Sequence, residues 1–501
     1  MTTNLMDKQY PCIKDADKKT IIEKITKYYN LYQYIISLGK KEGDVETKCL
    51  LFKLGAYFAA CNVCSVYADY DLEKELIYIA NKFEARIEDK YEKDTCLHVF
   101  TDAYSVGGHT RLIENFTSDS NTHKKHSIAI TSGKKSFDFE GNDKKFQNCH
   151  LLEGGEIAKA LELRRISSRY DKIILYTHMY DIVPLIAYGS SDFTRPVFYY
   201  NHADHRFWVG ASISDLVFEM STTGRMFSRL MRGIEHHHIL PIPVDVDGSA
   251  FKSKQYCRDR LKLPHDRHIV LSIGGASKYG KMFINTCMNA LKLRSDICFL
   301  IVGPDKNQKM WQDAYEKSHG RINAIGIVPH AEISAYYQAA DMYLDSMPVG
   351  GGTVMVEALL HQLPALTWDN GFTQFDAYIN CRVGIENLPH EISKILSKAN
   401  TDDKNALCDR VFAMHSSRRI NKKFNELLDK YDNHEIRNFS PLKKTLEIDM
   451  YDINLSKNMF HKFFLNREIF SKIPLKYQIR ILIYLLVKIK YMPQILPTLN
   501  Q

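Results

Sequence analysis

The sequence predicts two consecutive doubly wound α/β domains with added helical regions at both ends. Through the middle of the chain, short runs of apolar, β-branched and aromatic residues alternate with helical segments, which is typical of parallel sheets covered on both faces. The pattern occurs twice, before and after a segment with two prolines at 239–245. The length of 501 residues also exceeds the roughly 250–300 residues that one hydrophobic core usually organises.

Residues 1–95 are predicted to be a helical region. Apolar residues recur there at three- and four-residue spacing, with charged residues between them. Three stretches show this pattern: 19–38, 46–67 and 71–91. The second contains a single Cys-x-x-Cys, formed by Cys61 and Cys64. Because no second ligand pair accompanies it, we interpret these residues as buried cysteines rather than a metal or redox site.

The first α/β domain is predicted over residues 96–240, the second over 241–388, and a charged helical region over 389–501. In the first domain, strands are expected at 96–100, 126–131, 172–177, 196–202 and 215–221, with helices at 156–169 and 184–190. In the second, strands are expected at 268–275, 297–303, 322–328, 341–346 and 364–368, with helices at 283–293, 309–318, 332–339 and 353–361.

Composition excludes several classes of protein. The 67 Lys and Arg residues against 59 Asp and Glu leave a net charge of +8 that is scattered along the chain, without the compact basic block of a nucleic-acid-binding protein. The first eleven residues lack the apolar core of a secretion signal, and no apolar run is long enough to span a membrane. The odd number of cysteines, 11, suits free thiols in a reducing compartment. We therefore expect a cytoplasmic protein.

The most informative motif is the glycine-rich segment 348–359, which follows a predicted strand and opens a helix. Gly351 and Gly352 allow a ligand to approach the backbone closely, and the free N–H groups at a helix start favour an anion such as a diphosphate. Thr353 would add a hydroxyl, and Glu357, one turn further, could accept hydrogen bonds from two vicinal ribose hydroxyls. A flexible turn followed by an ordinary surface glutamate is the alternative interpretation.

Residues 326–367 combine this loop with a Gly-x-Val after a strand, a helix ending in Ala-Ala-Asp, and a Leu-Pro-Ala-Leu-Thr strand. This order resembles the C-terminal domain of GT-B glycosyltransferases, which have two Rossmann-like domains. The resemblance covers roughly residues 96–385 and implies a nucleotide-sugar donor held by the second domain. It also implies that Val328 contacts the donor, and that no metal and no cofactor is needed.

Within this superfamily, members with a Glu-x7-Glu motif retain the configuration of the sugar. Their first glutamate would fall on position 349, which is Val349 here. The loop instead resembles the Gly-x-Thr-(x)3-acid pattern of O-GlcNAc transferases and bacterial adhesin N-glucosyltransferases. That narrower resemblance implies an inverting mechanism.

Two lysines lie in the loop 274–281, directly after the first strand of the second domain. Departure of a sugar diphosphate leaves negative charge on the β-phosphate, and a lysine can neutralise this charge without a metal. GT-B enzymes commonly carry a basic residue at this loop. Lys278 best matches that position, and Lys281 is the second choice; a solvated loop lysine is the alternative.

In the first domain, Gly107, Gly108 and His109 follow the strand 96–100. A Gly-Gly turn is frequent at this place in GT-B enzymes and faces the donor phosphates. His109 could contact donor or acceptor and, as a neutral imidazole, could serve as a base near pH 7. A structural histidine at a helix start is an equally good interpretation.

The loop after the strand 196–202 contains Asn201, His202, Asp204, His205 and Trp208. Open α/β sheets bind ligands at the carboxyl ends of their strands, so these hydrogen-bonding and aromatic residues suit an acceptor pocket. Asp204 and His205 are the leading candidates for the base, with His109. A metal site formed by the two histidines and Asp204 is the disfavoured alternative, because crowding on a short loop does not ensure convergent geometry.

Three further features are weaker. His178 and Asp181 follow another strand and are candidates on the same argument. The run of three histidines at 236–238 is interpreted as a polar loop. The apolar segment 481–487 is bounded by basic residues, so 480–490 could rest on the inner face of a membrane. Packing of this segment against the first domain is the favoured alternative.

The resemblance therefore implies a glycosyltransferase that moves a hexose from a nucleotide sugar, with UDP as the expected nucleotide. The acceptor would be a protein, a glycan or a lipid-linked saccharide bound by the first domain, and nucleic acid is not expected as a partner. Two alternatives remain: a nucleotide-sugar epimerase of the same fold, and a scaffold that has lost its chemistry. The presence of Lys278 and Glu357 argues against the scaffold.

Overall fold

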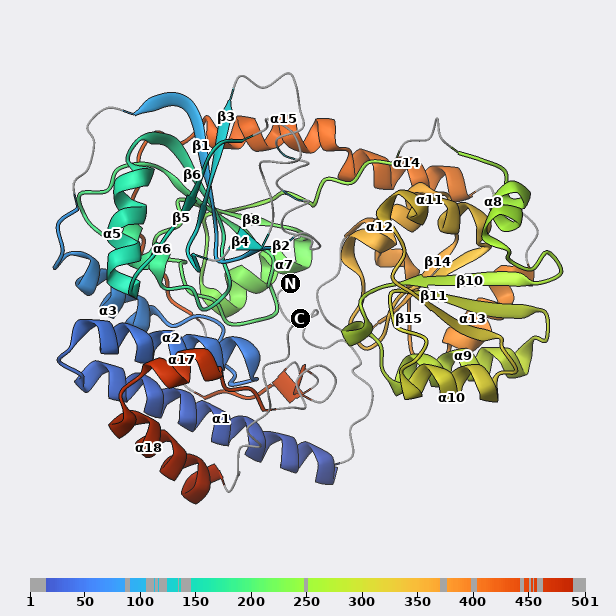
Figure 1. The fold of residues 1–501 in the computed structure, drawn as a ribbon, viewed down its shortest axis with the longest axis horizontal. Coiled ribbons are helices and arrows are strands. Elements are labelled where there is room, and N and C mark those ends of the chain that lie inside the picture. The colour runs from blue at the N-terminus through green and yellow to red at the C-terminus, as the bar shows by residue number, and fades with distance from the viewer. Residues whose placement is uncertain are drawn as a thin grey trace. The chain divides into compact units, whose positions relative to one another are not determined.

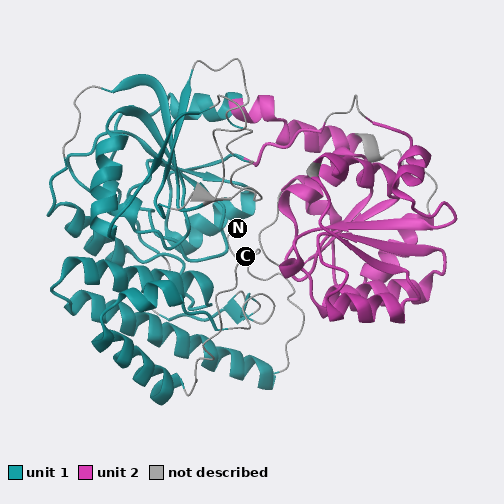
Figure 2. Ribbon diagram, in the orientation of Figure 1, with its two compact units in different colours: residues 1–240, 422–501 teal, residues 241–421 magenta. Residues whose placement is uncertain are grey.

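The chain forms two compact units, shown in Figure 2: unit 1 comprises residues 1–240 and 422–501, and unit 2 comprises residues 241–421. The computed structural model describes residues 15–85, 91–104, 112, 116, 124–133, 135–136, 146–246, 251–369, 376–397, 403–441, 446–449, 452–453, 455–456 and 463–489. Each unit is built around one parallel sheet with helices packed against it (Figure 1). The predicted fold class is thus confirmed.

The sheet of unit 1 has seven parallel strands in the order β5-β3-β1-β6-β7-β8-β9. The strands are β1 (Glu92–Phe100), β3 (Lys125–Ile130), β5 (Phe146–Leu151), β6 (Tyr170–Tyr176), β7 (Val197–Asn201), β8 (Leu216–Glu219) and β9 (His237–Ile239). A short pair, β2 (Ala103–Tyr104) with β4 (Lys135–Ser136), accompanies it. The prediction of a polar loop at 236–238 was wrong, because His237 and His238 pair with β8 as the edge strand β9.

Helices from both ends of the chain share one hydrophobic core with this sheet. Leu31, Phe52 and Leu76 lie on the N-terminal helices, and they belong to the same buried cluster as Leu97 on β1. Ile481, near the C-terminus, belongs to it as well. The helices of unit 1 are α1 (Asp15–Lys41), α2 (Val45–Cys61), α3 (Tyr70–Ala80), α5 (Glu156–Ser167), α6 (Val183–Tyr188), α7 (Thr222–Phe227), η1 (Ser228–Arg232), α17 (Arg467–Lys472), α18 (Leu475–Tyr484) and η5 (Leu485–Ile489).

His434 fastens the C-terminal extension to the sheet of unit 1. Its Nδ1 lies 2.8 Å from Asp215 Oδ2, and its Nε2 lies 2.9 Å from the carbonyl oxygen of Tyr188. Asp215 is fully buried and also accepts hydrogen bonds from the backbone N–H groups of Val197 and Glu435. The carboxylate therefore joins the start of β7 to a segment more than two hundred residues away.

We expect His434→Ala to lower the free energy of unfolding by about 3 kcal/mol, because removing one partner leaves a buried charge incompletely compensated. Chemical denaturation of the full chain measures this loss. Lys125→Ala is the matched control: it breaks the ion pair with Glu92, in which both side chains are about half exposed. Its cost should stay below about 1 kcal/mol. Equal losses for the two variants would contradict the assigned role of His434.

The sheet of unit 2 has six parallel strands in the order β12-β11-β10-β13-β14-β15. Strands are therefore added to one side of β10 as far as β12 and to its other side from β13 onward. The strands are β10 (His268–Ile273), β11 (Ile297–Val302), β12 (Ile322–Gly326), β13 (Met342–Leu344), β14 (Ala365–Trp368) and β15 (Arg382–Val383). The helices are α8 (Lys254–Leu261), η3 (Ala276–Lys278), α9 (Lys281–Leu293), α10 (Lys309–Lys317), α11 (His330–Ala339), α12 (Gly352–Leu360), η4 (Asp376–Cys381), α13 (Leu388–Ser397) and α14 (Asp403–His415). Helix α15 (Ser417–Leu428) runs from unit 2 into unit 1.

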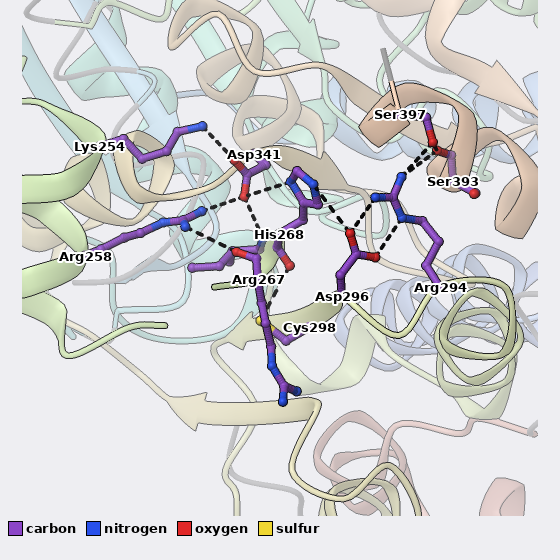
Figure 3. Close-up of polar contacts among 11 residues, drawn as sticks. Lys254, Arg258, Arg267, His268, Arg294, Asp296, Cys298, Asp341, Ser393 and Ser397 are labelled. Carbon is purple, nitrogen blue, oxygen red and sulfur yellow. Dashed lines mark hydrogen bonds and ion pairs between the residues drawn. The ribbon is translucent and has the colours of Figure 1, made fainter. Parts of the chain in front are cut away.

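A polar network ties helices to the amino ends of this sheet (Figure 3). Asp341, just before β13, accepts hydrogen bonds from Lys254 at 2.7 Å and Arg258 at 2.6 Å, both on α8. On the other side, Arg294 binds Asp296 with two hydrogen bonds, and this guanidinium lowers the pKa of Asp296 to about 2. His268 lies 3.8 Å from a carboxylate oxygen of each aspartate. These contacts hold the helices in place and leave the opposite, carboxyl edge of the sheet to the glycine-rich loops.

Candidate functional site

Glycines line the carboxyl edge of the unit 2 sheet at a point where the backbone needs them. Gly303, after β11, has φ of +118°, and a Cβ there would lie 2.0 Å from the carbonyl oxygen of Gly274, after β10. Its N–H donates to the carbonyl of Gly326, at the end of β12. Only a residue without a side chain fits this conformation and this contact. The ends of β10, β11 and β12 therefore approach one another closely, next to the topological switch point between β10 and β13. Open α/β sheets bind ligands at such a point.

The two loops predicted from sequence lie side by side at this edge. Tyr279 and Pro348 form an antiparallel bridge, and the N–H of Gly280 donates to the carbonyl of Met347 at 2.9 Å. The loop after β10 and the loop after β13 are thus one continuous surface. Lys278 of the first loop reaches Gly350 of the second. Gly351 follows directly, and Gly352, Thr353 and Glu357 lie on the helix α12 that this second loop opens.

Asp345 organises the glycine loop, and sequence analysis did not single it out. This fully buried carboxylate accepts hydrogen bonds from the N–H groups of Ser346 and Gly351 and from the hydroxyl of Thr367 on β14. Burial raises the pKa of Asp345 to about 6, although these donors and the Lys278 ammonium oppose the shift. A Cβ on Gly350 would lie 2.8 Å from its carboxylate oxygen, which explains a glycine there. In the sequence, the position of Asp345 directly after a buried strand was the signal that could have identified it.

This contact changes the role predicted for Gly351. Its N–H points at Asp345 and is therefore occupied within the protein. Helix α12 begins at the next residue, Gly352, and no side chain caps its start. The N–H groups that could receive a phosphate are consequently those of Gly352 and Thr353, both half-buried.

Lys278 lies over the same loop. Its side chain is half-buried, and Nζ lies 3.5 Å from the carbonyl oxygen of Gly350. Burial lowers the pKa of Lys278, and the negative charge of Asp345 partly offsets this effect. Lys281, by contrast, is exposed on the first turn of α9. Of the two lysines, Lys278 is the one directed toward the glycine loop.

Glu357 is held on α12 by a tyrosine from the preceding helix. The hydroxyl of Tyr337 lies 3.1 Å from Glu357 Oε2 and 3.0 Å from the carbonyl of Val354. Tyr337 is itself buried and stacks on His361, at 4.7 Å between ring centres. Glu357 remains half-buried, so its carboxylate has a fixed position and can still reach a ligand. Val328, also half-buried, follows β12 beside Ile327, which is 90% exposed.

In unit 1, the loop after β7 brings the two leading base candidates into contact. Asp204 Oδ1 lies 3.0 Å from His205 Nδ1. Asp204 is buried, whereas the side chain of His205 is 21% exposed. His205 and Arg206 line a narrow pocket together with residues from the segment 59–67. Arg206 Nε donates to the other ring nitrogen, His205 Nε2, at 3.4 Å. The imidazole is thus held between a carboxylate and a guanidinium, and His205 is the more exposed member of the pair with Asp204.

Two of the residues predicted to contact the acceptor have side chains that belong to the core. Trp208 is fully buried and stacks on Tyr199 at 4.3 Å between ring centres. Asn201 is also fully buried and donates to Glu219 Oε2 at 2.9 Å. Burial raises the pKa of Glu219 to about 7. His202, which is half-buried, stays a candidate for contact with the acceptor.

Other polar residues gather at the carboxyl edge of the unit 1 sheet. Buried Asp181 accepts hydrogen bonds from the hydroxyls of Thr101 and Thr131, which directly follow β1 and β3. His178 lies 3.7 Å from Asp102, and burial lowers the pKa of this histidine. Gly107, Gly108 and His109 lie outside the described residues. In the part of the chain that the structure describes, no group of three His, Cys, Asp or Glu residues is arranged to hold a metal ion.

An open pocket of about 350 Å³ lies at the other edge of the unit 2 sheet. Its lining includes Arg267, Cys298 and Asn323, beside the amino ends of the strands. The turns that present free N–H groups lie at the carboxyl ends of the strands, where ligands of open α/β sheets bind. This pocket lies at the opposite edge, so we do not assign it to the donor. The candidate site is therefore the surface formed by the two glycine-rich loops.

Comparisons with known proteins support the fold. The chain matches no known family model. It is 25% identical over 166 residues to alpha-monoglucosyldiacylglycerol synthase of Acholeplasma laidlawii, a match that covers 30% of this chain and 42% of that protein. The chain therefore matches less than half of the length of this curated relative.

Solved structures match over a larger part of the chain. A glycosyltransferase from Rickettsia africae superimposes with a TM-score of 0.54 and 15% identity, covering 68% of this chain and 99% of that one. Sucrose-phosphate synthase from Thermosynechococcus elongatus gives 0.52 with 14% identity, covering 67% and 98%. Anabaena HepE in complex with UDP and glucose gives 0.51 with 13% identity, covering 66% and 99%. The chain thus has the two-sheet GT-B fold seen in glycosyltransferases, with helical extensions.

Proposed function

We propose that this protein is a glycosyltransferase that takes a hexose from a UDP-sugar and transfers it to an acceptor held by unit 1. The single observation that carries the proposal is the joined pair of glycine-rich loops at the switch point of the unit 2 sheet. Lys278, the N–H groups of Gly352 and Thr353, and the carboxylate of Glu357 would bind the donor on this surface. The fold shared with HepE, whose structure contains UDP and glucose, supports the choice of donor.

Each group of the loop pair would have one task. The N–H groups at the start of α12 would bind the diphosphate, and Glu357 would accept hydrogen bonds from the ribose hydroxyls. Lys278 would neutralise the charge that grows on the β-phosphate as the sugar–oxygen bond breaks. Because the lysine supplies this charge, we propose that transfer does not need a divalent metal.

The acceptor would lose its proton to His205 as its oxygen or nitrogen attacks the anomeric carbon. Asp204 would hold the imidazole by its Nδ1–H and stabilise the imidazolium that forms. The bond to the acceptor forms as the bond to the diphosphate breaks, with inversion at the anomeric carbon. Determining the anomeric configuration of the product tests this step, since a retained configuration would remove the need for a base at this place.

We also propose a chemical class for the acceptor. The curated relative is named as a synthase of a glucosylated diacylglycerol, which favours a lipid or lipid-linked saccharide over a protein. The narrower resemblance to protein-modifying transferases rests on the single loop 351–357. An acceptor screen with a diacylglycerol, a lipid-linked saccharide and an acceptor peptide would separate these classes.

We expect UDP to stabilise the folded protein in the absence of divalent metal. A ligand that binds only the folded state raises the free energy of unfolding by roughly 2.7 kcal/mol at a hundredfold excess over its dissociation constant. Thermal unfolding with UDP plus a chelator measures the shift, and UMP, which lacks the β-phosphate, is the control. Stabilisation only with added metal would contradict the role of Lys278.

Two other outcomes would replace the proposal. Turnover of the UDP-sugar to an isomer without any acceptor would identify an epimerase. A lack of stabilisation by every nucleoside diphosphate would indicate a scaffold. Both assays use the full chain and the same preparation.

A further inference from the structure

The C-terminal helix of unit 1 is apolar on two opposite faces. Helix α18 and the turn η5 that continues it bury Tyr477, Ile481 and Leu485 in the core of unit 1. Tyr484 stacks on Tyr34 of α1 at 4.4 Å between ring centres, and Figure 1 shows α18 lying beside α1. This inner face accounts for the packing that the sequence favoured for the segment.

The outer face carries a second row of large apolar side chains, which we name the C-terminal stripe. Its members are Leu475, Ile479, Ile483, Leu486 and Val487. Each exposes between 46% and 66% of its surface. Spacings of three and four residues place them on one side of the helix. Scattered apolar residues are normal on a protein surface, but five in one row mark an interaction surface.

The segment of the chain that carries the stripe has charged residues of one sign. Residues 469–501 contain five basic residues and neither Asp nor Glu. Lys476, Arg480 and Lys488 are exposed on α18 and η5 among the apolar residues of the stripe. Lys476 lies 3.2 Å from Glu42, and the Arg480 guanidinium lies over the ring of Tyr477 at 5.7 Å. Long basic side chains beside an apolar row can extend toward anionic groups while their stems cover apolar surface.

We propose that the C-terminal stripe docks unit 1 onto the surface of an anionic lipid bilayer. The apolar side chains would enter the boundary between headgroups and acyl chains, and the basic side chains would bind lipid phosphates. A second copy of the chain fits less well, because a two-fold contact through the stripe would bring two basic rims together. None of the described helices is both long and apolar enough to cross a bilayer, so the helix would lie in the interface. The inference goes beyond the proposed function and does not depend on it.

Co-sedimentation of the full chain with vesicles tests the proposal. We expect binding to phosphatidylcholine vesicles that contain phosphatidylglycerol, and weaker binding to pure phosphatidylcholine. The double variant Ile479→Glu and Ile483→Glu should lower the partition coefficient at least about tenfold, because charged side chains cannot enter the apolar boundary. Arg480→Gln should lower it about fivefold, and added salt should reduce that difference.

Leu293→Glu is the matched control, since Leu293 on α9 of unit 2 is 44% exposed and lies outside the stripe. It should bind vesicles like the wild type, and all variants should keep the melting temperature of the wild type. Wild-type protein that fails to bind anionic vesicles, or a double variant that binds them equally well, would overturn the proposal. A wild-type dimer that the double variant converts to a monomer, without vesicle binding, would identify a second copy as the occupant.

Discussion

Replacing Lys278 by alanine should lower the rate of sugar transfer at saturating donor by about a hundredfold or more. The ammonium group faces the loop that would hold the diphosphate, and its pKa is lowered by burial and partly restored by Asp345. Charge on the β-phosphate grows as the bond breaks, so the interaction is stronger in the transition state than in the ground state. Steady-state kinetics should therefore show a large loss in kcat with a smaller change in donor affinity.

Glu357→Ala is the matched control for Lys278→Ala, because both side chains are assigned to the donor in unit 2. A ribose contact exists in the ground state and the transition state alike, so its loss should weaken donor binding and change kcat little. Calorimetric titration with UDP measures the first effect, and turnover at saturating donor measures the second. If both variants lost binding equally and kept normal turnover at saturation, the separate roles would be wrong.

His205→Ala should reduce turnover by on the order of a hundredfold or more and leave UDP affinity nearly unchanged. His205 is the more exposed member of the pair with Asp204, and it belongs to unit 1 rather than to the loops that would bind the donor. Asp204→Asn should act in the same direction, because the amide cannot stabilise the imidazolium. A role confined to folding would lower the melting temperature of both variants without this selective loss of kcat.

His109→Ala separates the two positions proposed for the base. If His205 is the base, this variant should keep turnover within a few-fold of the wild type. A large loss for His109→Ala with normal turnover for His205→Ala would move the base to the Gly-Gly-His loop. Normal turnover in all three variants would mean that the base lies elsewhere.

Local sequence patterns were sufficient to predict the fold and the two glycine-rich loops of unit 2. Alternating strands and helices indicated two parallel sheets, and both sheets are present. Glycines directly after strands marked the loops at Lys278 and Gly351, because backbone that approaches a ligand or another strand end closely needs residues without side chains. These signals are readable because they depend on neighbours only a few residues away.

Contacts between distant segments could not be predicted in the same way. Thr367 reaches Asp345 from the next strand, and Tyr337 holds Glu357 from the preceding helix. Trp208 has the composition of an acceptor contact, yet it lies in the core because its ring stacks on Tyr199. Whether a loop side chain faces inward depends on the residues that pack against it. Those residues lie in distant parts of the chain, so the local sequence does not reveal them.

The C-terminal helix shows this limit most clearly. The sequence determined that residues 475–489 are apolar and basic, which is compatible with packing and with a membrane surface alike. Both faces of the helix carry large apolar side chains, so periodicity alone cannot say which face is buried. Only the tertiary structure decided the matter, because the core of unit 1 buries Tyr477, Ile481 and Leu485 and leaves Ile479 and Ile483 exposed.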